Sequence, residues 1–203
     1  MEEFWNDRYS GVEFAYGEEP NEYFKEQLAK IKPGRILLPA EGEGRNGVCA
    51  ARQGWEVEAF DISTEGKKKA EHLANKHNLK INYQVGGLED LTYEPESFDA
   101  IALIFTHFDP KVRAEYHKEF VKLLKPGGTI ISETFSTNHL AYNKANPKVG
   151  GPKNIEYLTS LKQVKEEFEG IEMDELSAIE VIFDEGTFHV GKGEVIRFLR
   201  RKK

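Results

Sequence analysis

The sequence predicts an α/β fold in which helices cover both faces of a mostly parallel sheet. Over residues 35–135, short apolar runs rich in β-branched residues alternate with amphipathic stretches, as strands alternate with helices. Residues 177–183 and 194–199 are two further strand-like runs, separated by a glycine-containing turn region, and they indicate a closing antiparallel hairpin. The 203 residues fit a single domain.

The first predicted strand is the apolar run Arg35–Pro39, which a glycine-rich turn and a helix over about Arg45–Gln53 follow. Trp55–Phe60 is the second strand. Ser63 is a suitable N-cap for a helix that extends to about Asn78, because its hydroxyl can accept a hydrogen bond from the first helical turn. Ile81–Val85 is a short third strand.

The fourth strand is expected at Phe98–Phe105, where nearly every residue is apolar, as in a strand that is covered on both faces. The dipeptide Asp109-Pro110 predicts the start of a helix with proline in its first turn. This helix is expected to extend to about Leu124 and to end at a Pro-Gly-Gly turn. Thr129–Phe135 is the fifth strand.

Other segments flank this core. The polar stretch Ser136–Gly151 is unusually long for a loop in a compact domain, so we expect it to be a lid. Ser160 and Gln163 form the pattern of a capping box, which predicts a helix through Phe168. The 34 residues before the first strand contain an aromatic segment and an amphipathic helix over about Asn21–Ile31.

Composition narrows the classes of function. The formal net charge is −7, so the chain lacks the basic balance that phosphate-driven nucleic-acid binding requires. The longest apolar run, Ala100–Phe105, is far shorter than the roughly 20 residues that span a bilayer. The single cysteine, Cys49, excludes an internal disulfide and a cysteine-based zinc site, and no metal ligands are expected. With no signal or transit pattern at the N-terminus, these features predict a cytoplasmic protein without nucleic-acid or membrane partners.

A glycine-rich turn follows the first predicted strand. Residues Gly42 to Gly47 satisfy the pattern G-x-G-x-x-G, and glycines there let a ligand approach the backbone near a helix N-terminus. Asp61 lies 19 residues after Gly42, at the end of the second strand, which matches an acidic side chain that accepts hydrogen bonds from ribose hydroxyls. The combination predicts a ligand that contains adenosine. Nicotinamide or flavin oxidoreductases and S-adenosylmethionine (SAM) methyltransferases both use this arrangement.

Four stretches resemble the class I SAM-dependent methyltransferases, in particular the small-molecule branch that includes tellurite-resistance-type and thiopurine-type enzymes. ILLPAEGEGRNG is similar to the first motif of this family and WEVEAFDIS to the second. SFDAIALIF is similar to the fourth strand, and LLKPGGTIISE to the approach to the fifth. The last stretch is the most specific, because Leu-Lys-Pro-Gly-Gly before a strand is typical of this family and not of dehydrogenases.

The resemblance implies a Rossmann-like three-layer sandwich whose seven-stranded, mostly parallel sheet ends in an antiparallel hairpin. It implies one domain over 1–203, with an N-terminal cap at 1–34, a SAM-binding core at 35–135, and a substrate-side loop, helix and closing hairpin at 136–203. The implied reaction is methyl transfer from SAM to a small-molecule acceptor by in-line displacement, with S-adenosylhomocysteine (SAH) as product. A non-catalytic SAM-binding module and an NAD-dependent oxidoreductase are the alternatives. The oligomeric state is left open.

The resemblance also implies the residues that hold the methionine part and the ribose of SAM. Ala40, Glu41 and Gly42 would lie along the methionine part. Asp61 would hold the ribose hydroxyls.

A second group would surround the adenine. Ile62 would pack against the ring, and Phe105 would line the same pocket. Gly87 stands where the family usually has an aspartate, so Leu88 would contact the adenine through its backbone and Glu89 would supply the acceptor.

Two further features point to the same end of the sheet. His107 directly follows the fourth strand, and its ordinary pKa suits a general base, so it is a candidate base or substrate-positioning residue. A histidine that bonds only to the loop backbone is the alternative. The resemblance implies that Trp5, Tyr9 and Tyr16 belong to a lid over SAM, with the two tyrosine hydroxyls at the methionine end.

Overall fold

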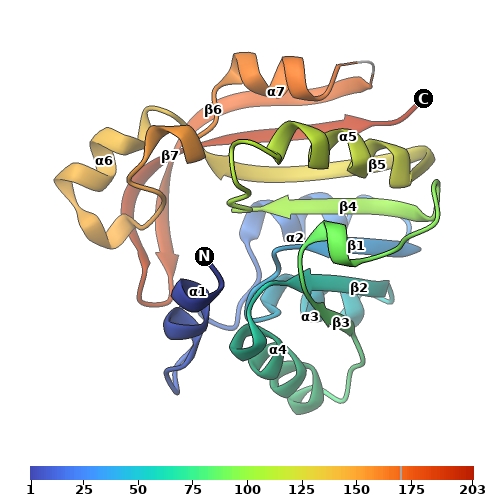
Figure 1. Ribbon diagram of the computed structural model, residues 1–203, viewed down its shortest axis with the longest axis horizontal. Helices are drawn as coiled ribbons and strands as arrows, with labels where there is room; N and C mark the ends of the chain where they lie inside the picture. The colour runs from blue at the N-terminus through green and yellow to red at the C-terminus, as the bar shows by residue number, and fades with distance from the viewer. Residues whose placement is uncertain (170) are drawn as a thin grey trace.

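The structure is a computed structural model that describes residues 1–169 and 171–203. Within these residues, seven strands form one sheet in the order β3-β2-β1-β4-β5-β7-β6 (Figure 1). The strands are β1 (Arg35–Pro39), β2 (Glu56–Asp61), β3 (Asn82–Val85), β4 (Phe98–Ile104), β5 (Leu124–Phe135), β6 (Glu172–Glu185) and β7 (His189–Arg201). The helices are α1 (Glu2–Tyr9), α2 (Glu22–Leu28), α3 (Arg45–Arg52), α4 (Thr64–Lys76), α5 (Arg113–Leu123), α6 (His139–Ala145) and α7 (Leu161–Glu167). Short 3-10 turns are η1 (Leu88–Asp90), η2 (Pro147–Val149) and η3 (Ile155–Tyr157).

The strand directions confirm the predicted fold class. Strands β1 to β5 pair in parallel, and β7 pairs antiparallel with both β5 and β6. The chain passes from β1 to β2 and β3 on one side, and then returns to β4 on the other side of β1. Such a reversal opens a crevice at the carboxyl ends of the strands, where ligands bind in folds of this class.

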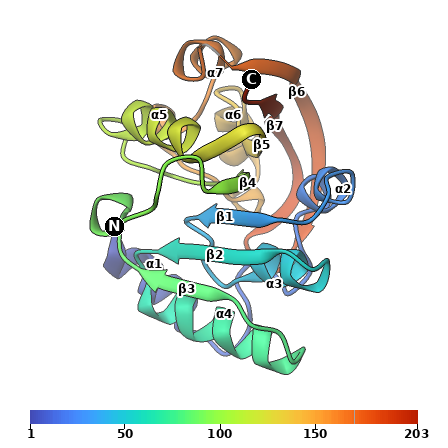
Figure 2. The same cartoon turned by 90° about the vertical axis from the view of Figure 1, so that its right-hand side faces the viewer.

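Alternate side chains of β1 build a core on each face of the sheet. Ile36 and Leu38 belong to one cluster with Val48 of α3, whereas Leu37 belongs to the other with Phe120 of α5. Figure 2 shows α2 and α3 on one side of the sheet and α5 on the other. The period-2 alternation of the strand therefore produces the three-layer sandwich.

The predicted caps of two helices are confirmed. The Ser63 side chain accepts a hydrogen bond from the N–H of Gly66 at 3.0 Å. Ser160 and Gln163 form a reciprocal capping box at the start of α7. The predicted helix over residues 21–31 is α2, and Asn21 caps it by accepting a hydrogen bond from the N–H of Phe24.

Some element ends differ from the prediction. Helix α5 begins at Arg113, because the Asp109 carboxylate bonds to the N–H of Lys111 and forms a turn before the helix. Strand β5 already includes the Pro-Gly-Gly sequence, where the N–H of Gly127 donates to the carbonyl of Lys202. The hairpin strands are also longer than predicted, since their antiparallel pairing extends from Glu185–His189 to Glu172–Arg201.

The segment 136–151, which the sequence predicts as a loop, contains α6 and η2. The Ser136 hydroxyl oxygen accepts hydrogen bonds from the N–H groups of Asn138 and His139, at 3.1 and 3.2 Å, where the helix begins. Asn143 and Val149 are buried. The polar side chains conceal the helix from pattern reading because they bond within the segment, as Asn143 does to the Gly150 carbonyl at 2.6 Å.

The N-terminal segment lies across the end of the sheet at which β1, β2 and β4 terminate (Figure 1). Helix α1 packs against α4, and the Asn6 side-chain oxygen accepts a hydrogen bond from the hydroxyl of Ser63 at 2.8 Å. In residues 1–169 and 171–203, no helix is both long and apolar enough to cross a membrane.

Candidate active site

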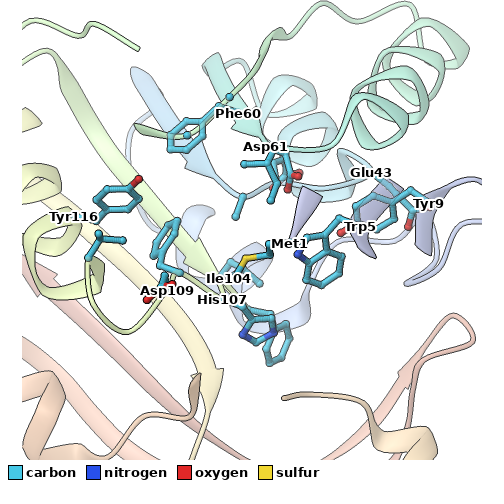
Figure 3. A pocket seen from close by; sticks show the side chains of 18 of the residues that line it. Met1, Trp5, Tyr9, Glu43, Phe60, Asp61, Ile104, His107, Asp109 and Tyr116 are labelled. Atoms are coloured by element: carbon cyan, nitrogen blue, oxygen red, sulfur yellow. The ribbon is translucent and has the colours of Figure 1, made fainter. Parts of the chain in front are cut away.

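A cavity of about 640 Å³ opens at the carboxyl ends of β1, β2 and β4. This volume is within the range of sites for drug-sized ligands. Figure 3 shows Trp5 and Tyr9 of α1 on one side of the cavity, and Asp109 and Tyr116 on the other. The segments that line it are α1 and the loop after it, the turn after β1, the first turn of α3, the ends of β2 and β4, the turns after β3 and β4, α5 and the start of β7.

Asp61 ties the end of β2 to the turn after β1. Its Oδ2 accepts a hydrogen bond from the N–H of Gly42 at 3.0 Å, and its Oδ1 accepts one from the N–H of Ser63 at 2.9 Å. Burial raises the pKa of this carboxyl to about 6, and the hydrogen bonds oppose the rise. Each oxygen has a further lone pair, so the carboxylate can accept hydrogen bonds from a pair of ligand hydroxyls as well.

Glu41 lies in the turn after β1 and also lines the cavity. Its Oε1 accepts a hydrogen bond from the N–H of Gly47 in the first turn of α3 at 2.7 Å. Burial raises the pKa of Glu41 to about 7, against the lowering effect of this hydrogen bond and of the nearby Arg45. A positive ligand would restore the charged form of this carboxyl, because an opposite charge lowers its pKa.

The charge of the wall favours a cationic ligand. Two of the lining side chains, Arg45 and Lys111, are cationic. Six are carboxylates: Glu41, Glu43, Asp61, Glu89, Asp109 and Glu115.

The cap residues contact one another on one side of the cavity. The rings of Trp5 and Tyr9 stack at 5.5 Å between centroids, and Trp5 also stacks over His107 at 6.3 Å. The hydroxyl of Tyr16 accepts a hydrogen bond from Arg8 at 3.0 Å. α1 and the loop after it therefore form one side of the cavity.

Glu43 connects the loop after α1 to α4 through hydrogen bonds and an ion pair. Its buried carboxylate accepts hydrogen bonds from the N–H groups of Ala15, at 2.8 Å, and Tyr16, and pairs with Lys69 of α4 at 2.8 Å. Hydrogen bonds to a charged acceptor contribute about 1.5–3 kcal/mol each. Glu43, the variable residue between Gly42 and Gly44, thus holds the N-terminal segment in place, a role that the glycine motif does not predict.

His107 lies between Trp5 and Phe135, with ring centroids 6.3 and 6.0 Å away. Its Nδ1 is buried and has no hydrogen-bond partner in the described part of the chain. Burial, with the added effects of His189 and His139, lowers the pKa of His107 to about 3, so the ring is neutral at physiological pH.

The structure brings most of the predicted site residues to this one cavity. Those on its wall are Trp5, Tyr9, Tyr16, Ala40, Glu41, Asp61, Ile62, Glu89, Phe105 and His107. Gly42 and Leu88 are not on the wall. Gly42 is covered by Tyr9, whose hydroxyl would be 2.6 Å from a Cβ at that position. Leu88 instead packs in the core with Phe60 and lines a smaller surface hollow.

Other wall residues had no signal in the sequence. Asn46 and Arg45 belong to the glycine motif but occupy its variable positions. Phe108 and Tyr116 come from the turn after β4 and from α5, and Tyr116 donates a hydrogen bond to Glu89 across the cavity rim. The predicted lid contributes nothing, because none of residues 136–151 lines the cavity.

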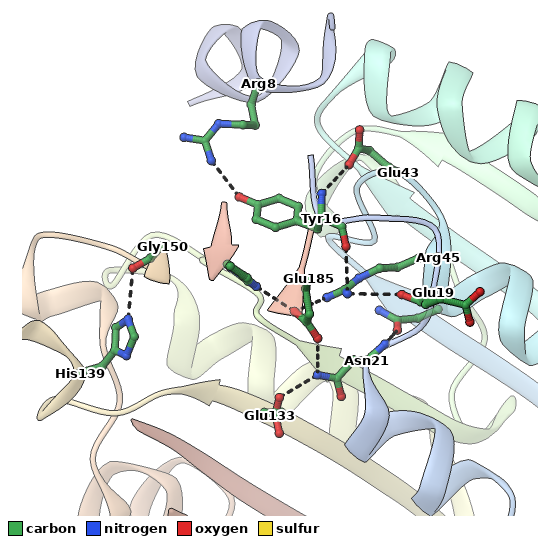
Figure 4. A network of polar contacts seen from close by, with 12 residues as sticks. Arg8, Tyr16, Glu19, Asn21, Glu43, Arg45, Glu133, His139, Gly150 and Glu185 are labelled. Carbon is green, nitrogen blue, oxygen red and sulfur yellow. Dashed lines mark hydrogen bonds and ion pairs between the residues drawn. The ribbon is translucent and has the colours of Figure 1, made fainter. Parts of the chain in front are cut away.

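A polar network closes the end of the cavity beside β7 (Figure 4). Glu185 accepts hydrogen bonds from Arg45 at 3.0 Å and from His189 Nδ1 at 2.9 Å. Asn21 connects Glu185 to Glu133 of β5, with distances of 3.4 and 2.7 Å. The network therefore joins the start of α2, α3, the hairpin and β5.

Comparisons with known proteins agree with this geometry. Residues 36–128 match the family model described as a methyltransferase domain. A ubiquinone/menaquinone biosynthesis C-methyltransferase, UbiE, from Geotalea daltonii is 33% identical over 134 residues, which are 58% of this chain and 56% of that protein. The chain thus matches little more than half the length of this curated relative.

Two solved structures have the same fold. One comes from work on the conversion of a disulfide bond into a thioacetal group during echinomycin biosynthesis. It has a TM-score of 0.80 and 17% identity, and the match covers 100% of this chain and 92% of the other. TehB from Haemophilus influenzae has a TM-score of 0.72 and 18% identity, over 100% of this chain and 67% of the other.

The sheet order, the cavity at the switch point and the acidic end of β2 define a methyltransferase-type nucleotide-binding domain. Residues 36–128 thus match a methyltransferase domain, in agreement with the resemblance to class I SAM-dependent methyltransferases found in the sequence.

Proposed function

We propose that the chain binds SAM in the cavity at the carboxyl ends of β1, β2 and β4 and transfers its methyl group to a small-molecule acceptor. The observation that carries the proposal is the position of Asp61, which lines this cavity at the end of β2 and whose two oxygens are held by backbone N–H groups. A carboxylate there suits the paired hydroxyls of a ribose.

The residues of the wall fit SAM in charge as well as in size. SAM is cationic at its sulfonium and at its amino group, and the wall has six carboxylates against two cationic side chains. When bound, SAM supplies an activated methyl group, so the protein needs only to position the acceptor and exclude water. Trp5 and Tyr9 cover the side of the cavity nearest α1 and would serve that exclusion.

A small acceptor is supported by the wall and by the relatives. Seven aromatic rings are among the lining side chains, and they suit a compact unsaturated molecule: Trp5, Tyr9, Tyr16, Phe60, Phe105, Phe108 and Tyr116. The matched relative from Geotalea daltonii is named for quinone biosynthesis.

Calorimetric titration with SAM, SAH and NAD tests the proposal. We expect SAM and SAH to bind and NAD not to bind. NAD binding without SAM binding would replace the proposal with an oxidoreductase. If SAM binds but no label passes from methyl-labelled SAM to a panel of phenol, thiol and amine acceptors, the chain is a non-catalytic SAM-binding module.

A further inference from the structure

His189 and Glu185 are paired next to the turn that connects β6 and β7. His189 Nδ1 is 2.9 Å from Glu185 Oε2, and the same oxygen accepts a hydrogen bond from Arg45 at 3.0 Å. Burial, opposed and overcome by His189 and Arg45, leaves the pKa of Glu185 at about 2, so this group is a carboxylate. A carboxylate can only accept, so Nδ1 of His189 must carry the proton.

This tautomer leaves Nε2 of His189 with a free lone pair. In residues 1–169 and 171–203, Nδ1 is the hydrogen-bonded nitrogen of this ring and Nε2 has no partner. The residue is 4% exposed, yet it lines the main cavity together with Tyr16 and Phe105. Burial lowers its pKa, so the ring is neutral and able to accept a proton at physiological pH.

Neighbouring rings pack against His189 and hold its ring in place. Its centroid is 4.5 Å from that of Tyr16, 4.9 Å from Phe105 and 5.3 Å from Phe183. Gly150, with a positive φ of 71°, lies so close that a Cβ there would be 2.6 Å from Cδ2 of His189. The carbonyl of Gly150 is in turn bonded by Asn143 of α6. The segment predicted as a lid thus packs beside the Cδ2–Nε2 edge of the His189 ring.

His107 lacks these features. Its Nδ1 is buried without a partner in the described part of the chain, so no neighbour fixes its tautomer. Among the described residues no carboxylate is hydrogen-bonded to His107 Nδ1, whereas Glu185 would stabilise a charged His189.

We propose that His189 is the general base of the transfer and Glu185 its positioning residue, and that the acceptor is a neutral aromatic hydroxyl. This inference rests on the proposed function. The O–H bond of the acceptor breaks and its proton goes to Nε2 of His189. The electron pair left on oxygen forms the bond to the methyl carbon, and the carbon–sulfur bond breaks with its electron pair on the thioether product. The aromatic wall beside His189 fits the body of such an acceptor.

The variant His189→Asn tests the base. An asparagine amide can still donate to Glu185 from the position of Nδ1, but it offers nothing in place of Nε2. His117→Asn is the matched control, because His117 Nδ1 also pairs with a glutamate, Glu167 at 2.7 Å, but does not line the cavity. Both proteins should bind SAM as the wild type does in a calorimetric titration.

The pKa of the acceptor then separates a base from a structural residue. With labelled SAM at pH 8, His189→Asn should lower kcat about 100-fold or more for phenol, which is protonated at this pH, and His117→Asn should not. For a nitrophenol that is already ionised at pH 8, the loss should nearly vanish, because no proton has to be removed. Equal losses on both acceptors, or methylation of neither by a SAM-binding wild type, would overturn the inference.

A second measurement needs no acceptor. Nitrogen-15 NMR of the imidazole groups should find His189 neutral and protonated at Nδ1 at pH 7, and Glu185→Gln should mix the two tautomers. The groups that face the ring and set its titration are Glu185 on β6, Arg45 on α3 and Arg8 on α1. A proton on Nε2 in the wild type would also overturn the inference. A wild type that binds no SAM but keeps this tautomer removes the proposed function alone.

Discussion

The Asp61 carboxylate accepts a hydrogen bond from the backbone N–H of Gly42 at 3.0 Å, and so joins the end of β2 to the turn after β1. The 19-residue spacing of these two residues in the sequence thus corresponds to a direct contact in space. The other Asp61 oxygen accepts a hydrogen bond from the N–H of Ser63. The two hydrogen bonds together orient the carboxylate before any ligand binds. A preoriented acceptor loses little entropy when it binds a pair of hydroxyls.

Asp61→Ala should therefore weaken SAM binding strongly. Hydrogen bonds to a charged acceptor contribute about 1.5–3 kcal/mol, which corresponds to a roughly 10–100-fold rise in Kd by calorimetric titration. Asp99→Asn is the matched control, because Asp99 also accepts a hydrogen bond from a backbone N–H, that of Arg35 at 2.8 Å, but lies at the amino-terminal end of β4. An unchanged Kd in Asp61→Ala would remove Asp61 from the SAM site.

Glu41 gives a prediction about pH and stability. Its pKa is about 7 in the folded protein against an ordinary value of 4.5, so between these pH values the folded state holds a proton that the unfolded state has lost. Unfolding then releases a proton, and the free energy of unfolding falls as pH rises through this window. Glu41→Gln has no proton to lose and avoids this fall.

The ligand-free Tm of Glu41→Gln, minus that of the wild type, should therefore increase between pH 5 and pH 8. A difference of about 1 kcal/mol in the free energy of unfolding corresponds to a difference of roughly 2–4 °C in Tm for a chain of this size. SAM binding should weaken in the same variant, because a carboxylate is lost from the wall. Exposed Glu94 supplies the control, and Glu94→Gln should show the same Tm difference from the wild type at both pH values. A pH-independent difference for Glu41→Gln would contradict the prediction.

The succession of strands along the chain and the place of Asp61 at the end of β2 were predictable because they depend on local patterns. Apolar runs of 5–8 residues mark β1 to β4, and Asp61 is placed by its distance from the turn. Helix α6 was not predictable, since its polar residues are satisfied within the segment and leave no apolar stripe. His189 reaches the site through the long hairpin pairing, and no local pattern records that its partner would be Glu185.

The cap gives a third prediction, which a pair of neighbouring aromatic residues can test. Trp5 lines the cavity and stacks on Tyr9 and His107, whereas Phe4 is 54% exposed and does not line it. Trp5→Ala should weaken SAM binding about 10-fold, because it opens the cavity to water, and should lower Tm only slightly. Phe4→Ala should change Kd less than about twofold. If both variants lose only Tm, α1 is a structural flap and not a lid.

The turn after β1 gives the last prediction, which concerns packing between α3 and α4. Gly44 has a φ of 88°, and a Cβ there would lie 2.5 Å from the Cβ of Ala70 on α4. Gly54 has nearly the same φ, 85°, but a Cβ there would meet no atom within 4 Å. The two glycines therefore have nearly the same backbone conformation, but only Gly54 has room beside it for a side chain.

Gly54→Ala should cost about 1–2 kcal/mol of unfolding free energy, the strain of a left-handed residue with a side chain. Gly44→Ala adds the cost of overpacking, about 1–3 kcal/mol, because α4 must move away. Urea unfolding measures both values under one condition. The excess loss in Gly44→Ala reports the contact with Ala70 alone, since the strain common to both variants cancels. Equal losses would show that α4 yields freely, and that the glycine is needed at this turn for its backbone angle only.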